Sequence, residues 1–338
     1  MARLRELWAE LRDAPGATRG AGYRLRLLET QGDARVYAAV SDASLAPALV
    51  VEIPQDVRPR SGIAAITKAF ESVLADFSGL SPGRVGIAIV LRDPTFEDLF
   101  AALAEEVIST VRQAPGTREA ARSIGRCIGR WRRFTEHHHR GLSDEEVQGL
   151  VGELVVLTRC IGRVGPRAAV TGWTGPEDAL RDFELPGASI EVKTYRSDAG
   201  AAVRINDPQQ LDDEGVRPVY LAAVRLAKME SKGQRLPDFV ARTAQFVSEE
   251  TEAADLFEER LAASGYLPVH ASDYTDRFVA EQLALYRVRP GFPRLAASQV
   301  PAGVVNVHFS IQLAALAEFA VDAVAVLGMP VPGVEGAR

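Results

Sequence analysis

The stretch "RDFELPGASIEVKTY", residues 181–195, restricts the fold of this chain more than any other segment. It has the form strand, Pro-Gly turn, strand, and in the second strand Ile190 and Val192 alternate with Glu191 and Lys193. Since the side chains of a strand point alternately to opposite faces, the apolar pair shares one face and the two charges share the other. We expect the apolar face to be core and the charged face to open on a cleft.

Asp182 adds a second carboxylate to this pair of charges. It precedes Glu191 by nine residues and Lys193 by eleven, and a tight hairpin through residues 185–189 would bring it beside them. Two carboxylates and the main-chain carbonyl of Val192 offer the hard oxygen ligands that suit Mg²⁺, with Mn²⁺ as a substitute. Such a metal stabilises charge on a phosphate and lowers the pKa of a bound water, while the lysine orients or deprotonates that water. The pattern points to phosphodiester hydrolysis, although a surface ion pair is the ordinary reason for such spacing.

The composition is that of an ordinary folded chain of 338 residues, 47% hydrophobic and 25% charged, which is long enough for two domains. No run approaches the roughly 20 apolar residues of a membrane helix, and charges interrupt any secretory signal, so we expect a cytoplasmic protein with no membrane partner. The formal net charge of −6 argues against non-specific coating of nucleic acid. Cys127 and Cys160 lack the spacing of a zinc site and are expected to be buried thiols.

Strand and helix patterns alternate along the chain and predict an α/β (α+β) fold. Alternating strands are expected first, at residues 23–30, 34–41, 47–54 and 83–91. A helix is expected over 93–112, with Asp93 as its cap. These elements form a smaller N-terminal α/β lobe, residues 1–112, of unknown role. Residues 113–338 form the second domain, with a last helix expected over 314–327.

The helix after the "APGT" break at 114–117 has the strongest amphipathic pattern in the chain. At about 100° per residue, its apolar side lies opposite a stripe of arginines, Arg118, Arg122, Arg126, Arg130 and Arg133. A solvated face is one interpretation, and contact with nucleic-acid phosphates is the other, since guanidinium groups are the preferred bidentate phosphate partners. We take Arg126, Arg130 and Arg133 as candidate substrate-binding residues. The three histidines that follow at 137–139 point about 100° apart on a helix, so a helix end or linker is favoured over a metal site.

A further helix pattern begins with a capping box of Ser143 and Glu146. Its apolar seam consists of Leu150, Leu154, Leu157 and Ile161, and Glu153 lies about 40° from that seam. A carboxylate there is costly unless it faces a cation or hydrogen-bond donors, although an edge residue that reaches solvent is the plainer interpretation. Glu153 joins the candidate set on this ground.

Trp173 stands shortly before Gly175 and Pro176, in the segment "GWTGP". A tryptophan before a Gly-Pro turn is more often a packing anchor than a base-stacking residue, and packing is the favoured interpretation. Tyr195, at the end of the charged strand, either contacts substrate or covers the site.

Taken in order, these motifs resemble a known family, the bacterial PD-(D/E)XK-motif proteins of restriction and phage-defence gene clusters. The resemblance covers roughly residues 90–315 and is carried by "FEDLFAALAEEVI", "IGRWRRF", "GLSDEEVQGLVGELVVL", "GWTGP", "DFELPGASIEVKT", "INDPQQLDDEG", "VYLAAVRL", "LAASGY", "LYRV" and "FPRL". It implies a restriction-endonuclease-like core, in which a central mixed sheet is flanked by helices.

The resemblance also implies roles for individual residues. It makes Asp182 the first metal acid, Glu191 the second, Lys193 the catalytic lysine and Glu153 a helix acid near the metal. Gln210 in "QQL" matches a glutamine that contacts phosphate or shapes the site, and Asp178 is the alternative first acid. The chain departs from the family at Tyr195 and at a valine in "GLVGELVVL", and neither change removes an acid or the lysine.

We therefore expect a Mg²⁺-dependent DNA endonuclease of a restriction or phage-defence system, with DNA and other proteins of a defence operon as partners. A homodimer would suit cleavage of two strands by a one-site enzyme. The alternative is a non-catalytic DNA-binding or assembly subunit, which the acidic net charge favours and the retention of all three core residues opposes. Substrates of RNA or repair intermediates share the same site chemistry and stay open.

Overall fold

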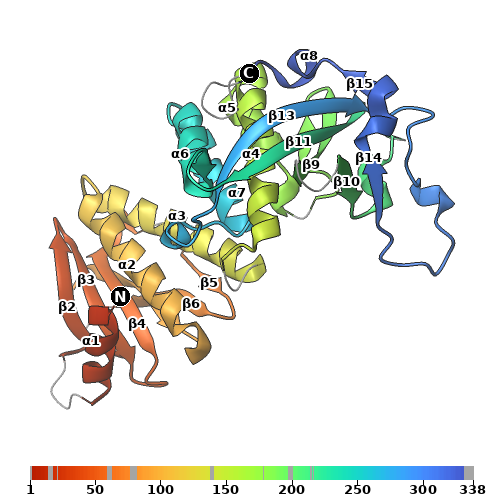
Figure 1. Cartoon of the computed structure of the whole chain (residues 1–338). Coiled ribbons are helices and arrows are strands. Elements are labelled where there is room, and N and C mark those ends of the chain that lie inside the picture. Colours follow the sequence, from red (N-terminus) through yellow and green to blue (C-terminus); the bar gives the residue numbers. More distant parts are fainter. Residues whose placement is uncertain are drawn as a thin grey trace. The chain divides into compact units, whose positions relative to one another are not determined.

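The computed structural model describes residues 2–13, 18–20, 22–58, 63–76, 82–137, 141–177, 179–196, 201–213, 215 and 217–330 (Figure 1). The chain divides into two compact units, Met1–His139 and Arg140–Arg338. Within the described ranges, no helix is long and apolar enough to cross a membrane.

The N-terminal unit is built on a seven-stranded antiparallel sheet of order β1-β2-β3-β4-β7-β6-β5 (Figure 1). Its strands are β1 (Thr18–Gly20), β2 (Tyr23–Gln31), β3 (Ala34–Ser41), β4 (Pro47–Pro54), β5 (Ala65–Ile66), β6 (Phe70–Asp76) and β7 (Arg84–Leu91). Its helices are α1 (Ala2–Asp13), α2 (Glu97–Gln113) and α3 (Thr117–His137), with 3-10 turns at Gln55–Val57 and Pro94–Phe96. The four expected strands are confirmed as β2, β3, β4 and β7, and the expected helix as α2 with a 3-10 first turn that Asp93 caps.

The division of the chain falls between residues 139 and 140, which differs from the expected boundary at 112. Helix α3 packs on α2, and the indole N–H of Trp131 donates to Glu106 Oε2 at 2.7 Å. The apolar side of α3, which includes Ile124 and Phe134, is fully buried. The "APGT" break is thus a turn between two packed helices of one unit. The roles given to the two parts of the chain stay predictions.

The C-terminal unit is built on a mixed sheet of order β12-β13-β11-β9-β8, with β15 paired to β13. Strands β9 and β11 are parallel, and the other pairs are antiparallel. The strands are β8 (Phe183–Leu185), β9 (Ala188–Arg196), β11 (Val219–Met229), β12 (Gln234–Arg235), β13 (Arg277–Arg287) and β15 (Ala320–Val321). A separate two-stranded sheet consists of β10 (Ala202–Ile205) and β14 (Phe309–Gln312).

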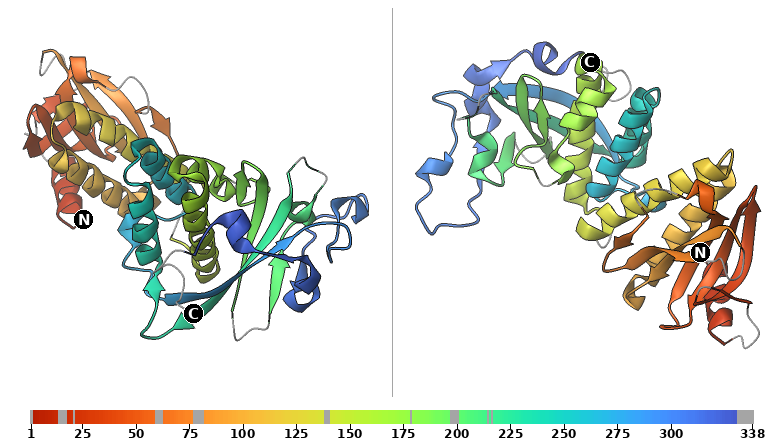
Figure 2. Two further views of the ribbon diagram at one scale, coloured as in Figure 1. Left: turned by 90° about the horizontal axis from the view of Figure 1, so that it is seen from above. Right: turned by 180° about the vertical axis from the view of Figure 1, so that it is seen from behind.

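Two hydrophobic cores cover the two faces of the mixed sheet. One core contains Ile190, Val192 and Phe278 and lies under the helices, which Figure 2 shows gathered beside the sheet: α4 (Asp144–Val164), α5 (Pro166–Gly172), α6 (Leu236–Val247), α7 (Thr251–Ala263) and α8 (Ala323–Leu327). The other core joins Leu221 to the β10–β14 sheet and to 3-10 turns at Pro208–Leu211 and Leu313–Phe319. Further 3-10 turns are Gly175–Glu177, Pro268–His270 and Ala297–Gln299. This is the predicted mixed α/β class, with a central mixed sheet and flanking helices.

The single helix expected over 314–327 is wrong. The segment is a 3-10 turn, a short strand and a five-residue helix instead. Leu313, Leu316 and Phe319 are buried at a spacing of three, which fits a 3-10 turn, and Asp322 caps the short helix through the N–H of Val324.

Candidate active site

The hairpin predicted from the sequence is confirmed as β8 and β9. The two strands pair in antiparallel register with Phe183 opposite Ile190, and Gly187 in the turn has a φ of 94°, which favours glycine. Asp182 lies immediately before β8, and its Oδ2 accepts a hydrogen bond of 2.7 Å from the N–H of Val192. The first predicted acid is therefore bound to the strand that carries the other acid and the lysine.

Glu191 and Lys193 share a face of β9 and form an ion pair, with Lys193 Nζ 2.5 Å from Glu191 Oε1. Glu191 is only 1% exposed, and the side chain of Lys193 is 15% exposed. No hydrogen-bond donor among the described residues reaches Glu191 Oε2. An unsatisfied oxygen is costly at such burial, so this carboxylate is suited to a further cation.

The two faces of β9 differ from the simple expectation of core and cleft. Ile190 and Val192 are 0% and 7% exposed, which confirms the core face. The opposite face does not open along its whole length, because Tyr195 packs against the second core and Glu191 is buried. Tyr195 is therefore a packing residue in this structure, and the partly exposed residues of the site are Glu153, Asp182 and Lys193.

Glu153 lies on α4, where its Oε2 accepts a hydrogen bond of 2.7 Å from the indole N–H of Trp173. The position of Glu153 called for a donor or a cation, and the indole is that donor. Trp173 is 0% exposed and bridges to Phe183, so the packing interpretation of this residue agrees with its surroundings. The sequence did not reveal that the same ring also holds an acid.

Burial raises the pKa of all three acids of the site. The pKa of Glu153 is raised to about 8, with the Asp182 charge adding to the effect and the Trp173 N–H opposing it. Burial and the Asp182 charge raise the pKa of Glu191 to about 8 against the attraction of Lys193. Burial also raises the pKa of Asp182, again opposed by Lys193. Burial lowers the pKa of Lys193, but the carboxylates of Glu191 and Asp182 outweigh it and leave that pKa above its ordinary value. Without a further cation, burial therefore favours the protonated, neutral forms of these acids near neutral pH.

Two glycines that sequence reasoning missed allow these elements to approach closely. Gly152 faces β9 from α4, and a Cβ there would overlap the methyl group of Thr194. A Cβ at Gly175 would lie 2.8 Å from Asp182 Oδ1 and 3.3 Å from Glu153 Oε2. A glycine next to a candidate acid, as in "GEL", was the signal in the sequence.

The groups that could hold a divalent ion are the carboxylates of Asp182 and Glu191 with the main-chain carbonyl of Val192. The unsatisfied Oε2 of Glu191 supports the fit. Among the residues that the structure describes, no group of three or more His, Cys, Asp or Glu side chains has the arrangement of a metal site. A set of two carboxylates and one carbonyl suits Mg²⁺, which retains several waters and takes phosphate oxygens.

Gln210 is tied to the site through main-chain contacts. Its Oε1 accepts the N–H groups of Asn206 and Asp207 at 3.2 and 3.3 Å, so the amide caps a turn. Its main-chain oxygen accepts a hydrogen bond of 2.8 Å from Nε of Arg181, the residue before Asp182. These contacts support the site-shaping interpretation of Gln210. Arg181 escaped notice in the sequence because, apart from Glu184, its partners are main-chain carbonyls, which leave no trace in side-chain patterns.

The arginine stripe lies on α3, in the N-terminal unit. Arg126 pairs with Glu119 at 2.9 Å and Arg130 with Glu106 at 2.6 Å, while Arg133 is partly exposed. Arg126 and Arg130 thus have acidic partners in their own unit, and contact of the three candidates with a substrate stays a prediction.

Three other sequence candidates need only brief placement. Asp178 and the last two histidines of 137–139 lie outside the described residues, as does the side chain of the first. Cys127 and Cys160 are buried free thiols, as expected, and burial raises the pKa of Cys160 to about 12.

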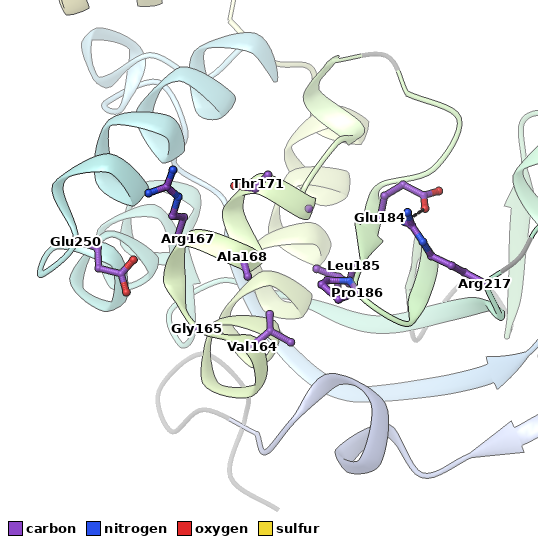
Figure 3. A pocket seen from close by; sticks show the side chains of 11 residues that line it. Val164, Gly165, Arg167, Ala168, Thr171, Glu184, Leu185, Pro186, Arg217 and Glu250 are labelled. Atoms are coloured by element: carbon purple, nitrogen blue, oxygen red, sulfur yellow. Dashed lines mark hydrogen bonds and ion pairs between the residues drawn. The ribbon is translucent and has the colours of Figure 1, made fainter.

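A pocket of about 720 Å³ lies beside the β8–β9 turn, between that turn and α5 (Figure 3). Ala168, Leu185 and Pro186 line it, and the ion pair of Arg217 with Glu184 lies at one side (Figure 3). None of the predicted catalytic residues lines this pocket. It is a neighbour of the candidate active site and not the site itself.

Comparison with protein-family models matches residues 4–314 to a family described as "Putative PD-(D/E)XK family member, (DUF4420)". Neither the curated proteins nor the solved structures give a match. The family match spans most of both units and agrees with the motifs of residues 90–315, and the mixed sheet with flanking helices is consistent with a restriction-endonuclease-like core. Such a family indicates a nuclease-type function. The chain belongs to the PD-(D/E)XK family that this model describes.

Proposed function

We propose that the protein is a Mg²⁺-dependent endonuclease that hydrolyses DNA phosphodiester bonds. The observation that carries this proposal is the β8–β9 hairpin, on which Asp182 bonds to the N–H of Val192 while Glu191 and Lys193 pair on the same strand. The arrangement combines two acids, a lysine and a buried oxygen that lacks a donor among the described residues. These are the residue types that metal-assisted attack on a phosphodiester requires.

Asp182 and Glu191, with the carbonyl of Val192, hold the ion in this proposal. The ion supplies charge stabilisation on the phosphate and lowers the pKa of water when it is bound. The hydrogen bond from the N–H of Val192 fixes the orientation of the Asp182 carboxylate before any ligand arrives.

Lys193 acts as a donor and a positive charge. Because its pKa lies above the ordinary lysine value, the ammonium keeps its proton at neutral pH. A protonated lysine cannot accept a proton, so its role is to orient the attacking water and to stabilise negative charge on the phosphate.

Glu153 assists with proton transfer. A carboxyl group whose pKa is about 8 is partly protonated near neutral pH and exchanges a proton readily there. Its place beside Asp182 puts that capacity next to the proposed metal ligands.

The direct test is cleavage of supercoiled and linear DNA by the purified protein with Mg²⁺. Glu191→Ala and Lys193→Ala are expected to lower cleavage by at least about a hundredfold, since each removes a group that acts in the transition state. Glu230→Gln, at an exposed glutamate of the same unit, is the control and should cleave like wild type. Cleavage undiminished in both alanine variants would sink the proposal, and an RNA substrate in parallel distinguishes the two nucleic acids.

The second candidate is a non-catalytic DNA-binding or assembly subunit that works with other proteins of a defence operon. The observations that favour it are the net charge of −6 and the pairing of Arg126 and Arg130 with acids of their own unit. Calorimetric titration with Mn²⁺ separates the two functions. A metal site predicts binding to wild type that Asp182→Ala abolishes, and a purely structural site predicts no heat of binding in either protein.

A further inference from the structure

We infer that Trp173 is a positioning residue of the proposed nuclease site: its indole N–H holds Glu153, and the two residues after it hold Asp182. The inference rests on the proposed function, because positioning these acids affects cleavage only if the acids act in it. It gives the segment "GWTGP", residues 172–176, a role in the reaction in addition to packing.

The indole ring is fixed on several sides. The main-chain N–H of Trp173 donates to the carbonyls of Ala169 and Val170 in α5, at 3.0 and 3.2 Å. The ring centroid lies 5.9 Å from that of Phe257, and the side chain is 0% exposed. A ring held in this way presents its N–H to Glu153 in one direction only.

The chemistry of the donor limits where a proton can reside on Glu153. An indole N–H donates and never accepts, and it lies 2.7 Å from Glu153 Oε2. Oε2 therefore accepts from the indole in either protonation state, and because a carbonyl oxygen accepts better than a hydroxyl oxygen, the hydrogen bond favours a proton on Oε1 over one on Oε2. Trp173 thus distinguishes the two oxygens of this acid.

The residues next in sequence hold the other acid. The N–H groups of Thr174 and Gly175 donate to the main-chain oxygen of Asp182 at 2.8 and 3.0 Å. Both carboxylates lie against Gly175, where a Cβ would come within 3.3 Å of each. One short segment therefore sets the spacing of two acids that come from α4 and from the start of β8.

A neutral donor is suited to this position. Burial, and after it the charge of Asp182, raises the pKa of Glu153, and the hydrogen bond from Trp173 opposes that shift. A cationic donor would stabilise Glu153 as well, but it would repel a metal ion held by the neighbouring acids. The indole orients the carboxyl group without adding charge.

The test is single-turnover cleavage of a DNA duplex with Mg²⁺ by Trp173→Phe, which keeps a ring and removes the N–H. We expect a fall of about tenfold or more in the cleavage rate, because the acid loses its fixed orientation. Trp8→Phe is the matched control, since Trp8 is also 0% exposed and donates its indole N–H to the Ala48 carbonyl, at 2.9 Å, in the N-terminal unit. It should cleave like wild type.

A double-mutant comparison shows whether Trp173 acts through Glu153. In a Glu153→Ala background, Trp173→Phe is expected to lower the rate no further. An equal loss with and without Glu153, or a Trp173→Phe variant as fast as wild type, overturns the inference while the proposed function stands. Wild-type protein that cleaves no DNA overturns the proposed function and this inference with it.

A spectroscopic measurement covers the case in which Trp173→Phe does not fold. The chain has three tryptophans, so a ¹⁵N-labelled sample gives three indole N–H signals, which Trp8→Phe and Trp131→Phe assign by elimination. Glu153→Ala is expected to move the Trp173 signal and to leave those of Trp8 and Trp131 in place. An unmoved Trp173 signal means that the hydrogen bond is absent, and the inference fails.

Discussion

Replacing Glu191 by glutamine is expected to stabilise the metal-free protein at pH 8 and to leave its stability nearly unchanged at pH 5. Glutamine keeps the shape of the side chain and removes the ability to ionise. The wild-type carboxyl group is 1% exposed, and burial raises its pKa from the ordinary value of 4.5 to about 8. Lys193 and Arg181 oppose the shift, and Asp182 adds to it.

The sign follows from which state binds the proton more tightly. The folded protein holds the Glu191 proton up to about pH 8, whereas the unfolded chain releases it near pH 4.5. Between these values the folded state carries more protons, so wild-type stability falls as the pH rises. A tenfold change in proton affinity corresponds to about 1.4 kcal/mol, which puts the loss between pH 5 and pH 8 at about 3 kcal/mol. That is a large part of the stability of an ordinary domain.

The assay is urea unfolding of wild type and Glu191→Gln at pH 5, 6, 7 and 8, in the presence of EDTA. The difference in unfolding free energy should grow with pH in favour of the glutamine variant. Glu230→Gln, at an exposed glutamate, should follow the wild-type curve. If the unfolding free energies of wild type and Glu191→Gln change in parallel between pH 5 and pH 8, the reasoning that ionising the buried carboxyl group lowers the stability of the folded state is refuted.

Four further substitutions test the packing and the surface of the proposed enzyme. A Cβ added at Gly149 on α4 meets nothing within 4 Å, so Gly149→Ala should raise the unfolding free energy by up to about 1 kcal/mol. A Cβ at Gly152 would overlap Thr194, so Gly152→Ala should lower it by about 1–3 kcal/mol. Equal urea midpoints for the two variants would contradict this. Gly175→Ala would place a Cβ 2.8 Å from Asp182 Oδ1, so cleavage should fall about tenfold or more, and an unchanged rate would show that the acids tolerate displacement. Arg133→Ala should weaken DNA binding and reduce the slope of log affinity against log salt by about one; an unchanged slope in a binding titration would remove the arginine stripe from the interface.

Local patterns predicted the central part of the site. The period-2 alternation around Glu191 and Lys193 and the Pro-Gly turn are properties of adjacent residues, so the hairpin and the shared face could be read directly. The hairpin also predicted that Asp182 would lie beside the second strand, although not its hydrogen bond to the N–H of Val192.

Tertiary contacts account for what the sequence did not show. The hydrogen bond from Trp173 to Glu153 joins residues 20 positions apart and depends on how α4, α5 and β8 pack together. The boundary expected at 112 assigned α3 to the second domain, whereas the apolar side of α3 is buried in the N-terminal unit. An amphipathic pattern shows that a helix has an apolar face, but not which element packs against that face. Likewise, the alternation on β9 did not reveal the second core that Tyr195 joins.

The central claim is that Asp182 and Glu191 hold a divalent ion beside Lys193. The most direct measurement is a crystal structure of the protein with Mn²⁺ and a short DNA duplex, with anomalous diffraction data recorded near the manganese edge. The account predicts an anomalous peak in contact with the carboxylates of Asp182 and Glu191 and with the carbonyl of Val192, and a Lys193 ammonium that has turned from Glu191 toward the phosphate. A fully occupied Mn²⁺ elsewhere, with Lys193 still 2.5 Å from Glu191 and no anomalous density between the two acids, would contradict it.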